Sequence, residues 1–236
     1  MANAYFRFKQ FTIRQDRCAL KVGTDGLLLG SWTKYTLAER ILDIGTGTGL
    51  LALIAAQRNP NAMIDAVEID PASAEQAMEN VAAGPWPDRI NIHRGDIRQW
   101  ACKDHYDLVL CNPPFYSRYL PSADVRKAVA KHDLSLTITE LMEAMDVRCA
   151  MNGRISMIIP TDRLAEVIAL AASRRFNPSR KCLVYFMANK LPKRVLLEFS
   201  RKFDQAEELS ELNVQLVPGE FSPEYRALLS DLDLHF

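Results

Sequence analysis

The chain has 236 residues, of which 48% are apolar and 25% are charged, and its formal net charge is zero. This composition is typical of a globular protein with a substantial core, and it excludes disordered, collagen-like and disulfide-dense chains. The five cysteines are scattered and form no C-x-x-C pair, so the sequence indicates neither a metal site nor a disulfide framework.

The sequence shows no membrane or secretion signal. No stretch reaches the roughly 18 consecutive apolar residues of a membrane span, and residues 1–11 lack the apolar region of a secretory signal. We therefore expect a cytoplasmic protein that has no membrane partner and binds no metal.

Short apolar runs alternate with helical patterns from about residue 40 onward. Strands are predicted over 40–44, 63–68, 90–94, 106–111, 154–159, 182–187 and 194–199, and helices over 50–57, 71–83, 137–149 and 162–173. Strands that alternate with helices favour an α/β fold with a parallel sheet, and the last two strands are joined by a short turn. We predict a mostly parallel seven-stranded sheet with an antiparallel C-terminal edge and helices on both faces.

The charges are segregated along the chain although they sum to zero. Residues 171–202 contain nine basic residues and one acid, whereas residues 203–236 contain eight acids and one base. The N-terminus is also basic. Two basic segments on one face would attract a polyanion, but the same segregation also fits an ordinary solvated surface.

Candidate ligand-binding residues follow three of the predicted strands. Residues 43–49 read D-I-G-T-G-T-G, whose glycines let a backbone pass close to a ligand just before a helix N-terminus. The spacing is not the G-x-G-x-x-G of dinucleotide enzymes. Glu68 ends the second strand, where an acid can accept hydrogen bonds from ribose hydroxyls, and Asp96 follows the third. Each acid alone also fits a helix cap.

The sharpest motif is N-P-P-F-Y at residues 112–116, after the fourth strand. Two prolines fix the backbone and remove two N–H donors. They would hold the Asn112 side-chain carbonyl and a backbone carbonyl as acceptors, with the aromatic ring of Phe115 beside them. This arrangement suits a planar substrate that carries an NH2 group, although a rigid loop with an apolar anchor has the same composition.

Together these motifs resemble the class I S-adenosylmethionine-dependent methyltransferases, in which N-P-P-F accompanies methylation of amino or amide nitrogens. A closer resemblance begins upstream, where K-V-G-T-D-G-L-L-L-G at residues 21–30 is similar to a run in the bacterial tRNA adenine-N6 methyltransferases. Members of that family modify the adenosine beside the anticodon of valine tRNA. The segments F-R-F-K-Q-F (6–11), I-D-A-V-E (64–68) and L-P-K-R-V-L-L (191–197) also match, so the resemblance covers most of the chain.

The resemblance implies a Rossmann-like class I methyltransferase fold and S-adenosylmethionine as the cofactor. Residues 1–36 would be a basic extension that carries K-V-G-T-D-G and packs on the core, 37–202 the methyltransferase domain, and 203–236 an acidic segment of that same domain. The expected partner is tRNA in its anticodon stem-loop region, and the expected state is a monomer or weak dimer.

The resemblance and the motifs also assign site residues. The catalytic set is Asn112, Pro113, Pro114 and Phe115. The cofactor set is Lys21, Gly23, Thr24, Asp25, Asp43, Gly45, Gly47, Gly49, Glu68 and Asp96. The RNA set is Arg7, Lys9, Arg14, Arg17, Tyr116, His132 and Arg194, although a lone histidine such as His132 is more often structural.

Four alternatives stay open from the residues alone. N-P-P-F also occurs in rRNA guanine-N2 methyltransferases, and glutamine-N5 protein methyltransferases carry the related N-P-P-Y. A non-catalytic RNA-binding module could retain the fold, although the intact motifs argue against lost catalysis. An NAD(P)-dependent oxidoreductase is disfavoured by the glycine spacing.

Overall fold

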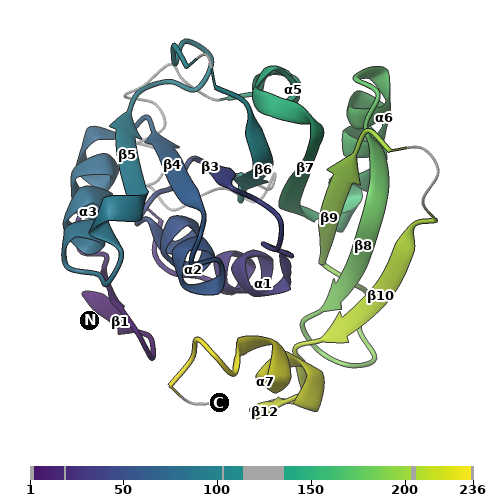
Figure 1. Cartoon of the computed structure of the whole chain (residues 1–236). Coiled ribbons are helices and arrows are strands. Elements are labelled where there is room, and N and C mark those ends of the chain that lie inside the picture. The colour runs from purple at the N-terminus through teal and green to yellow at the C-terminus, as the bar shows by residue number, and fades with distance from the viewer. Residues whose placement is uncertain (1–2, 19, 103, 114–135, 203–205, 235–236) are drawn as a thin grey trace.

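The computed structural model describes residues 3–18, 20–102, 104–113, 136–202 and 206–234, and its centre is one large sheet (Figure 1). The strands of this sheet are Arg40–Ile44 (β3), Met63–Glu68 (β4), Ile90–Arg94 (β5), Tyr106–Cys111 (β6), Cys149–Pro160 (β7), Asn177–Tyr185 (β8), Arg194–Ser200 (β9) and Glu208–Asn213 (β10). Their spatial order is β10-β8-β9-β7-β6-β3-β4-β5. Within this sheet only β9 runs against the other strands, because it pairs antiparallel with both β7 and β8.

The α/β class and the mostly parallel sheet are confirmed, and two details differ from the expectation. The antiparallel strand lies inside the sheet, between β7 and β8, rather than at its edge. An eighth strand, β10, forms the outer edge beside β8. Its sequence gave little signal because Leu212 is its only buried residue.

The segregated charges of the sequence meet in this part of the sheet. The acidic strand β10 lies alongside the basic strand β8, and Glu208 approaches Arg180 at 3.4 Å. Glu207, which precedes β10, pairs with Lys181 at 3.1 Å. Part of the basic segment 171–202 is therefore neutralised by the acidic segment that follows it, and it does not form a uniform anion-attracting face.

Helices cover both faces of the sheet. Four helices contribute side chains to one core: Thr24–Trp32 (α1), Leu50–Arg58 (α2), Pro71–Ala82 (α3) and Pro223–Leu229 (α7). The other core is formed with Ile138–Arg148 (α5) and Leu164–Ser173 (α6). Short 3-10 turns at Pro87–Arg89 and Thr161–Arg163 precede β5 and α6.

The local sequence explains where helices α3 and α5 begin. Asp70 caps α3 by accepting from the backbone N–H of Ser73 at 2.8 Å, and Pro71 occupies the first helical position. Thr137 and Glu140 form a capping box at the start of α5. The Asp70 cap comes two residues after the end of β4, so it sets how the chain turns from that strand into α3.

The two terminal segments pack on the same core. The hairpin of Tyr5–Arg7 (β1) and Thr12–Arg14 (β2) leads into α1, and Phe8, Phe11 and Ile13 are buried there. At the other end, a second hairpin of Gln215–Val217 (β11) and Glu220–Phe221 (β12) leads into α7, which packs against α1.

Candidate active site

The motifs singled out in the sequence meet at one edge of the sheet. Strands β6, β3, β4 and β5 are parallel neighbours in that order, so their carboxyl ends lie side by side. Ile44 pairs with Val67 on one side and Cys111 on the other, and Glu68 pairs with Arg94. Asn112, the glycine-rich turn, Glu68 and Asp96 therefore follow adjacent strand ends, which is where α/β sheets bind ligands.

The glycine-rich turn has a backbone that favours glycine. Gly45, Gly47 and Gly49 all have left-handed φ angles, of 71°, 57° and 84°. A Cβ atom at Gly45 or Gly47 would meet no described atom within 4 Å, so this side of the turn is open. At Gly49 a Cβ would lie 3.5 Å from Ala77 of α3. The turn thus offers open backbone to a ligand on one side and packs on a helix on the other.

Glu68 ties this turn to the neighbouring strand. Its Oε2 accepts from the backbone N–H of Gly47 at 2.8 Å, and its Oε1 accepts from that of Asp70 at 2.9 Å. The residue is 9% exposed, and burial raises the pKa of its carboxyl group. Each carboxylate oxygen keeps a further lone pair, so Glu68 can still accept from a ligand hydroxyl.

Asp43 lies beneath the turn and is fully buried. Its Oδ2 accepts from the hydroxyl of Thr46 at 2.6 Å, whereas its Oδ1 has no hydrogen-bond partner among the described residues. Burial raises the pKa of Asp43 to about 7. An oxygen of a buried carboxylate that lacks a partner among the described residues is costly to ionise, which fits the raised pKa of Asp43.

The carboxylate of Asp96 forms an ion pair with Arg98, two residues further along the chain. Its carboxylate receives three side-chain bonds of 2.6–3.0 Å from Arg98, and Arg98 also contacts Glu140 at 3.1 Å. These hydrogen bonds from Arg98 lower the pKa of Asp96. The assignment of Asp96 to an adenine amino group stays a prediction, and the ion pair holds its carboxylate in one orientation.

Asn112 lies beside the N-terminus of α1. A Cβ atom on Gly26 would be 3.8 Å from the Asn112 Nδ2 atom and 3.0 Å from Leu50 of α2. The K-V-G-T-D-G segment therefore passes next to the motif after β6. Leu27, Leu28 and Leu29 are buried in the core, so this segment packs on the core as predicted.

The remaining predicted residues of this segment differ in exposure. Lys21 is exposed, and its Nζ lies 3.4 Å from the carbonyl of Asn3. Gly23 caps α1 with an extended backbone, and Thr24 is the first helical residue. Asp25 accepts a hydrogen bond from Arg194 at 2.7 Å. A residue predicted to bind the cofactor, Asp25, is therefore paired with a residue predicted to bind RNA, Arg194.

The basic residues of the N-terminus are all exposed, but they differ in the partners that their side chains contact. Arg17 forms ion pairs with Glu75 (3.8 Å) and Glu79 of α3, and Lys9 donates to the Ser230 carbonyl at 2.5 Å. Arg7 lies over the ring of Tyr5. The Arg14 side chain makes no hydrogen bond or ion pair in the described part of the chain.

Two buried amides that the sequence analysis missed attach the N-terminal segment to α3. Asn80 accepts from the backbone N–H of Arg14 and donates to its carbonyl, and also to the carbonyl of Thr48 in the glycine-rich turn, at 2.8–2.9 Å. Gln76 accepts from the N–H of Arg17 at 2.8 Å. The sequence does contain a signal for these contacts. Gln76 and Asn80 lie four residues apart, and they interrupt the face of small apolar residues on α3.

Part of the predicted site lies outside the described residues. This applies to Pro114, Phe115, Tyr116 and His132. Asn112 and Pro113 are described, and both are half-buried.

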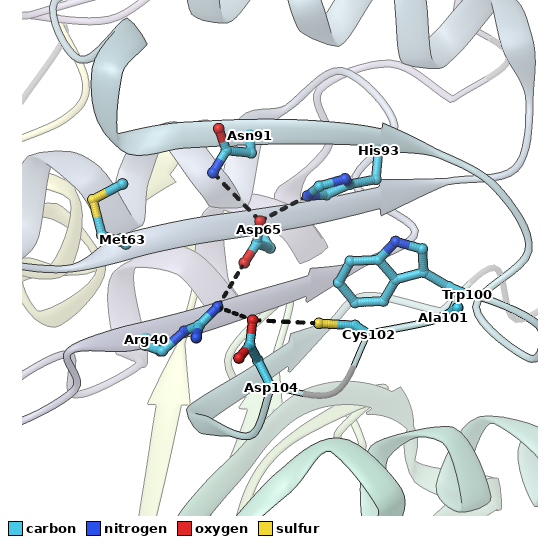
Figure 2. A pocket seen from close by; sticks show the side chains of 9 residues that line it. All are labelled: Arg40, Met63, Asp65, Asn91, His93, Trp100, Ala101, Cys102 and Asp104. Carbon is cyan, nitrogen blue, oxygen red and sulfur yellow. Dashed lines mark hydrogen bonds and ion pairs between the residues drawn. The ribbon is translucent and has the colours of Figure 1, made fainter.

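A cavity of about 510 Å³ lies at the opposite end of strands β3, β4 and β5 (Figure 2). Asp65 is at its centre and accepts from His93 at 2.7 Å, Tyr106 at 3.0 Å, and Arg40 and Asn91 at 3.4 Å. The polar groups of this cavity largely satisfy one another. The two acids of β4 therefore differ: Asp65 belongs to an internal network, whereas Glu68 lies at the edge with the glycine-rich turn.

In the described ranges, no three His, Cys, Asp or Glu side chains are grouped as metal ligands would be. No described helix is long and apolar enough to cross a membrane.

Comparison with known proteins identifies the family. Residues 19–135 match the model of the methyltransferase small domain. The chain is 40% identical over its full length to the tRNA1(Val) (adenine(37)-N6)-methyltransferase of Bacteroides thetaiotaomicron, covering 99% of that protein. It is 41% identical to the protein of the same name from Tolumonas auensis, over 99% of this chain and 98% of that one.

Solved structures agree on the fold. A predicted O-methyltransferase from Agrobacterium tumefaciens superposes with a TM-score of 0.68 at 20% identity, over 88% of this chain and 96% of the other. A ribosomal protein L11 methylase from Lactobacillus delbrueckii gives 0.53 at 19% identity, over 75% and 77%. The sequence relatives have much higher identity to this chain than these structures do. Because that identity extends over nearly the whole length of both proteins, the chain belongs to the tRNA1(Val) (adenine(37)-N6)-methyltransferase family.

Proposed function

We propose that this protein transfers the methyl group of S-adenosylmethionine to the exocyclic N6 of an adenine in tRNA, namely adenosine 37 beside the anticodon of valine tRNA. The observation that carries the proposal is the side-by-side placement of Asn112 and the glycine-rich turn, which follow the neighbouring strands β6 and β3. An acceptor for an NH2 group and a backbone open to a large ligand thus lie at one edge. The names of the close relatives support adenine as the base.

The residues at this edge fit the cofactor. Gly45 and Gly47 leave open space beside a backbone that only glycine adopts readily, and Glu68 presents carboxylate oxygens on the next strand. Asp43 lies beneath, and its Oδ1 atom has no hydrogen-bond partner in the part of the chain that the structure describes. The K-V-G-T-D-G segment would close over the methionine end, and Asp96 would lie toward the adenine. When bound, S-adenosylmethionine supplies a methyl group on an electrophilic sulfonium.

Asn112 and Pro113 would orient the target amine. The Asn112 side-chain oxygen and the Pro113 carbonyl would accept the two amine hydrogens, which draws electron density onto the nitrogen and aims its lone pair. Positioning of this kind can supply much of the rate acceleration. No general base is required before attack, because the nitrogen can lose its proton afterwards.

The RNA would approach across basic residues of the N-terminal hairpin and of β9. Arg7 and Arg14 lie on the N-terminal hairpin, which Asn80 joins to the glycine-rich turn, and Arg194 begins β9. Phe115 and Tyr116 follow Asn112-Pro113 in sequence and would stack on the flipped base. An anticodon loop is single-stranded, so extruding its base costs little.

Transfer of labelled methyl groups to bulk tRNA from cells that lack this protein tests the proposal. We expect label in the nucleic acid that nuclease releases and protease does not, with N6-methyladenosine as the labelled nucleoside. N2-methylguanosine would retain the reaction type but reject the base. Cofactor binding without any transfer to tRNA would contradict the proposal and direct the search to rRNA and protein substrates.

A further inference from the structure

Asp25 and Arg194 form an ion pair between residues that lie 169 positions apart in the sequence. The Arg194 Nε atom donates to the Asp25 Oδ2 atom at 2.7 Å. Both side chains are about three-tenths exposed, at 31% for Arg194 and 29% for Asp25. The pair joins the second residue of α1 to the first residue of β9.

The pair lies at the same edge of the sheet as Asn112. Arg194 is the cross-strand partner of Pro160, which ends β7 at its carboxyl side. Asp25 precedes Gly26, the residue whose added Cβ would lie 3.8 Å from the Asn112 Nδ2 atom. The guanidinium therefore lies at the sheet edge that is proposed to receive the target base.

The Arg194 guanidinium is fixed but not saturated. Its Nη1 donates to the carbonyl of Lys193 at 3.1 Å, and its charge lies 6.0 Å from the centre of the Phe186 ring. Its Nη2 has no hydrogen-bond partner among residues that the structure describes. A planar guanidinium held on one side, with free donors on the other, is well suited to a phosphate oxygen.

We propose that Asp25 is a positioning residue that orients Arg194 toward a backbone phosphate of the RNA next to the target nucleotide. This inference rests on the proposed function. It reassigns Asp25, which the sequence placed with the cofactor, to the recognition of substrate through Arg194.

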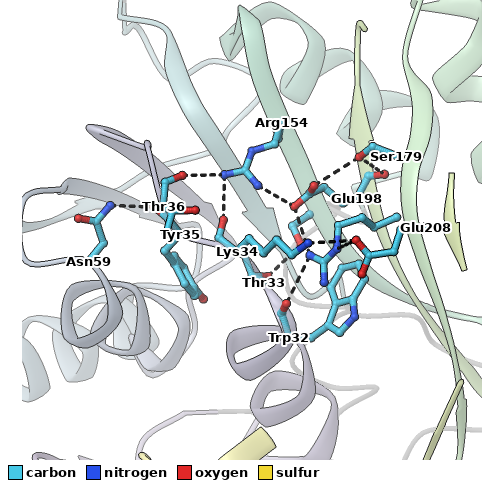
Figure 3. A network of polar contacts seen from close by, with 12 residues as sticks. Trp32, Thr33, Lys34, Tyr35, Thr36, Asn59, Arg154, Ser179, Glu198 and Glu208 are labelled. Atoms are coloured by element: carbon cyan, nitrogen blue, oxygen red, sulfur yellow. Dashed lines mark hydrogen bonds and ion pairs between the residues drawn. The ribbon is translucent and has the colours of Figure 1, made fainter. Parts of the chain in front are cut away.

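The contribution of this ion pair to the free energy of folding is expected to be small, so stability alone does not account for it. An ion pair that water still reaches on both partners contributes little to folding. The other end of α1 is attached independently (Figure 3): Arg154 donates to the carbonyls of Lys34 and Thr36, and the Thr33 and Ser156 hydroxyls lie 2.9 Å apart. Helix α1 is therefore also anchored by contacts that do not involve Asp25, and its residues Gly26 to Ser31 are buried.

The Asp25→Asn variant separates orientation from charge. It keeps the side-chain size and removes one negative charge beside a proposed phosphate site. If Asp25 acted only through its charge, the variant would bind RNA more tightly and its KM for tRNA would fall. If Asp25 orients Arg194, we expect that KM to rise about tenfold, the loss expected when one charged hydrogen bond is misplaced. The dissociation constant of S-adenosylmethionine should stay within about twofold, since Asp25 would not touch it.

A double variant tests whether Asp25 acts through Arg194. In the Arg194→Gln background, Asp25→Asn should add no further increase in KM, because the group that it orients is gone. Lys34→Gln is the matched control. It breaks an exposed ion pair with Glu208 (3.0 Å) just beyond the opposite end of the same helix, and it should leave the KM for tRNA unchanged.

Three outcomes would overturn the inference. A weaker affinity of Asp25→Asn for S-adenosylmethionine would place Asp25, or Arg194 through it, on the cofactor. Additive effects in the double variant, or an unchanged or lower KM in Asp25→Asn, would show that Asp25 does not orient Arg194. An unaltered protein that methylates no tRNA would instead refute the proposed function, and the measurement on that protein alone distinguishes the two failures.

Discussion

The Glu68 Oε2 atom lies 2.8 Å from the backbone nitrogen of Gly47, so the acid that ends β4 holds the glycine-rich turn after β3. The same carboxylate can hold a ligand and the loop that surrounds the ligand. Its removal should therefore weaken cofactor binding in two ways, by loss of an acceptor and by release of the turn.

We expect Glu68→Gln to weaken the binding of S-adenosylmethionine by about 10- to 100-fold, because charged hydrogen bonds are replaced by neutral ones. Titration calorimetry measures this directly. Asp65→Asn is the matched control on the same strand, since Asp65 belongs to the separate network of Figure 2. That variant should lose stability while its cofactor affinity stays near that of the unaltered protein. Equal losses of affinity in both variants would contradict a specific role for Glu68.

The buried Asp43 carboxyl group should make stability depend on pH. Burial raises its pKa to about 7, whereas in the unfolded chain it releases its proton near pH 4. Between these values the native state binds more protons than the unfolded state, so the free energy of unfolding falls as pH rises. The contribution of this one group is at most about 1.4 kcal/mol per pH unit.

Asp43→Asn removes this titration and nearly preserves the side-chain size. Urea unfolding from pH 5 to pH 8 should show that the variant gains stability relative to the unaltered protein as pH rises toward 7, with no further change above it. Parallel profiles for the two proteins would mean that Asp43 titrates at its ordinary pKa.

Asn112→Ala should nearly abolish methyl transfer, with a loss of about 100-fold or more in kcat, because the amine loses an acceptor that aims it. Affinity for S-adenosylmethionine should remain within a fewfold of the original. Single-turnover kinetics and calorimetry separate the two effects. Asn91→Ala, at the opposite end of the sheet, provides the control and should keep kcat. Turnover at the original rate in Asn112→Ala would refute the role given to this side chain.

Helices α1 and α2 approach so closely at Gly30 that a Cβ there would lie 2.6 Å from the Ile54 Cδ1 atom. Gly30→Ala should therefore destabilise the fold by about 1–3 kcal/mol through overpacking. Ile54→Val removes the clashing carbon, so the double variant should be more stable than the two single effects predict. Gly95→Ala is the control, because a Cβ at Gly95 meets no described atom within 4 Å. Thermal or urea unfolding measures the stability of the three variants. If the stability losses of the two single variants simply add in the double variant, the clash between the Cβ added at position 30 and the Ile54 Cδ1 atom is refuted.

Arg14 and Arg17 should contribute differently to RNA binding although both are exposed. Arg17 is already paired with Glu75 and Glu79, whereas the Arg14 side chain has no ion pair within the described ranges. We expect Arg14→Gln to lower the slope of log affinity against log salt by about one, and Arg17→Gln to change it little. Filter binding of tRNA at several salt concentrations gives both slopes. The reverse order would show that the N-terminal hairpin meets RNA through Arg17.

The sequence was sufficient for the elements whose pattern is local. Strands β3 to β6 have the predicted bounds, because each is a short buried run that ends at a turn or a loop. Helix α3 was predicted within one residue from its Asp70-Pro71 start. The positions of Glu68 and Asn112 at one edge followed from the order of parallel strands, which needs no knowledge of side-chain contacts.

What the sequence could not predict depends on residues far apart in the chain. Helix α1 is apolar nearly all round and gave no amphipathic pattern. Strand β10 has one buried residue, and its place in the sheet comes from its parallel pairing with β8. The Asp25–Arg194 pair and the Asn80 contacts join segments whose proximity arises only when the sheet forms.

Methylation of a matched pair of valine tRNA transcripts, with adenosine or guanosine at position 37, most directly tests whether this protein methylates N6 of adenosine 37. Purified protein and labelled S-adenosylmethionine are supplied, and the digested nucleosides are identified by mass spectrometry. We expect N6-methyladenosine in the adenosine transcript and no incorporation in the guanosine transcript. Equal incorporation in both, or a labelled N2-methylguanosine, would contradict it.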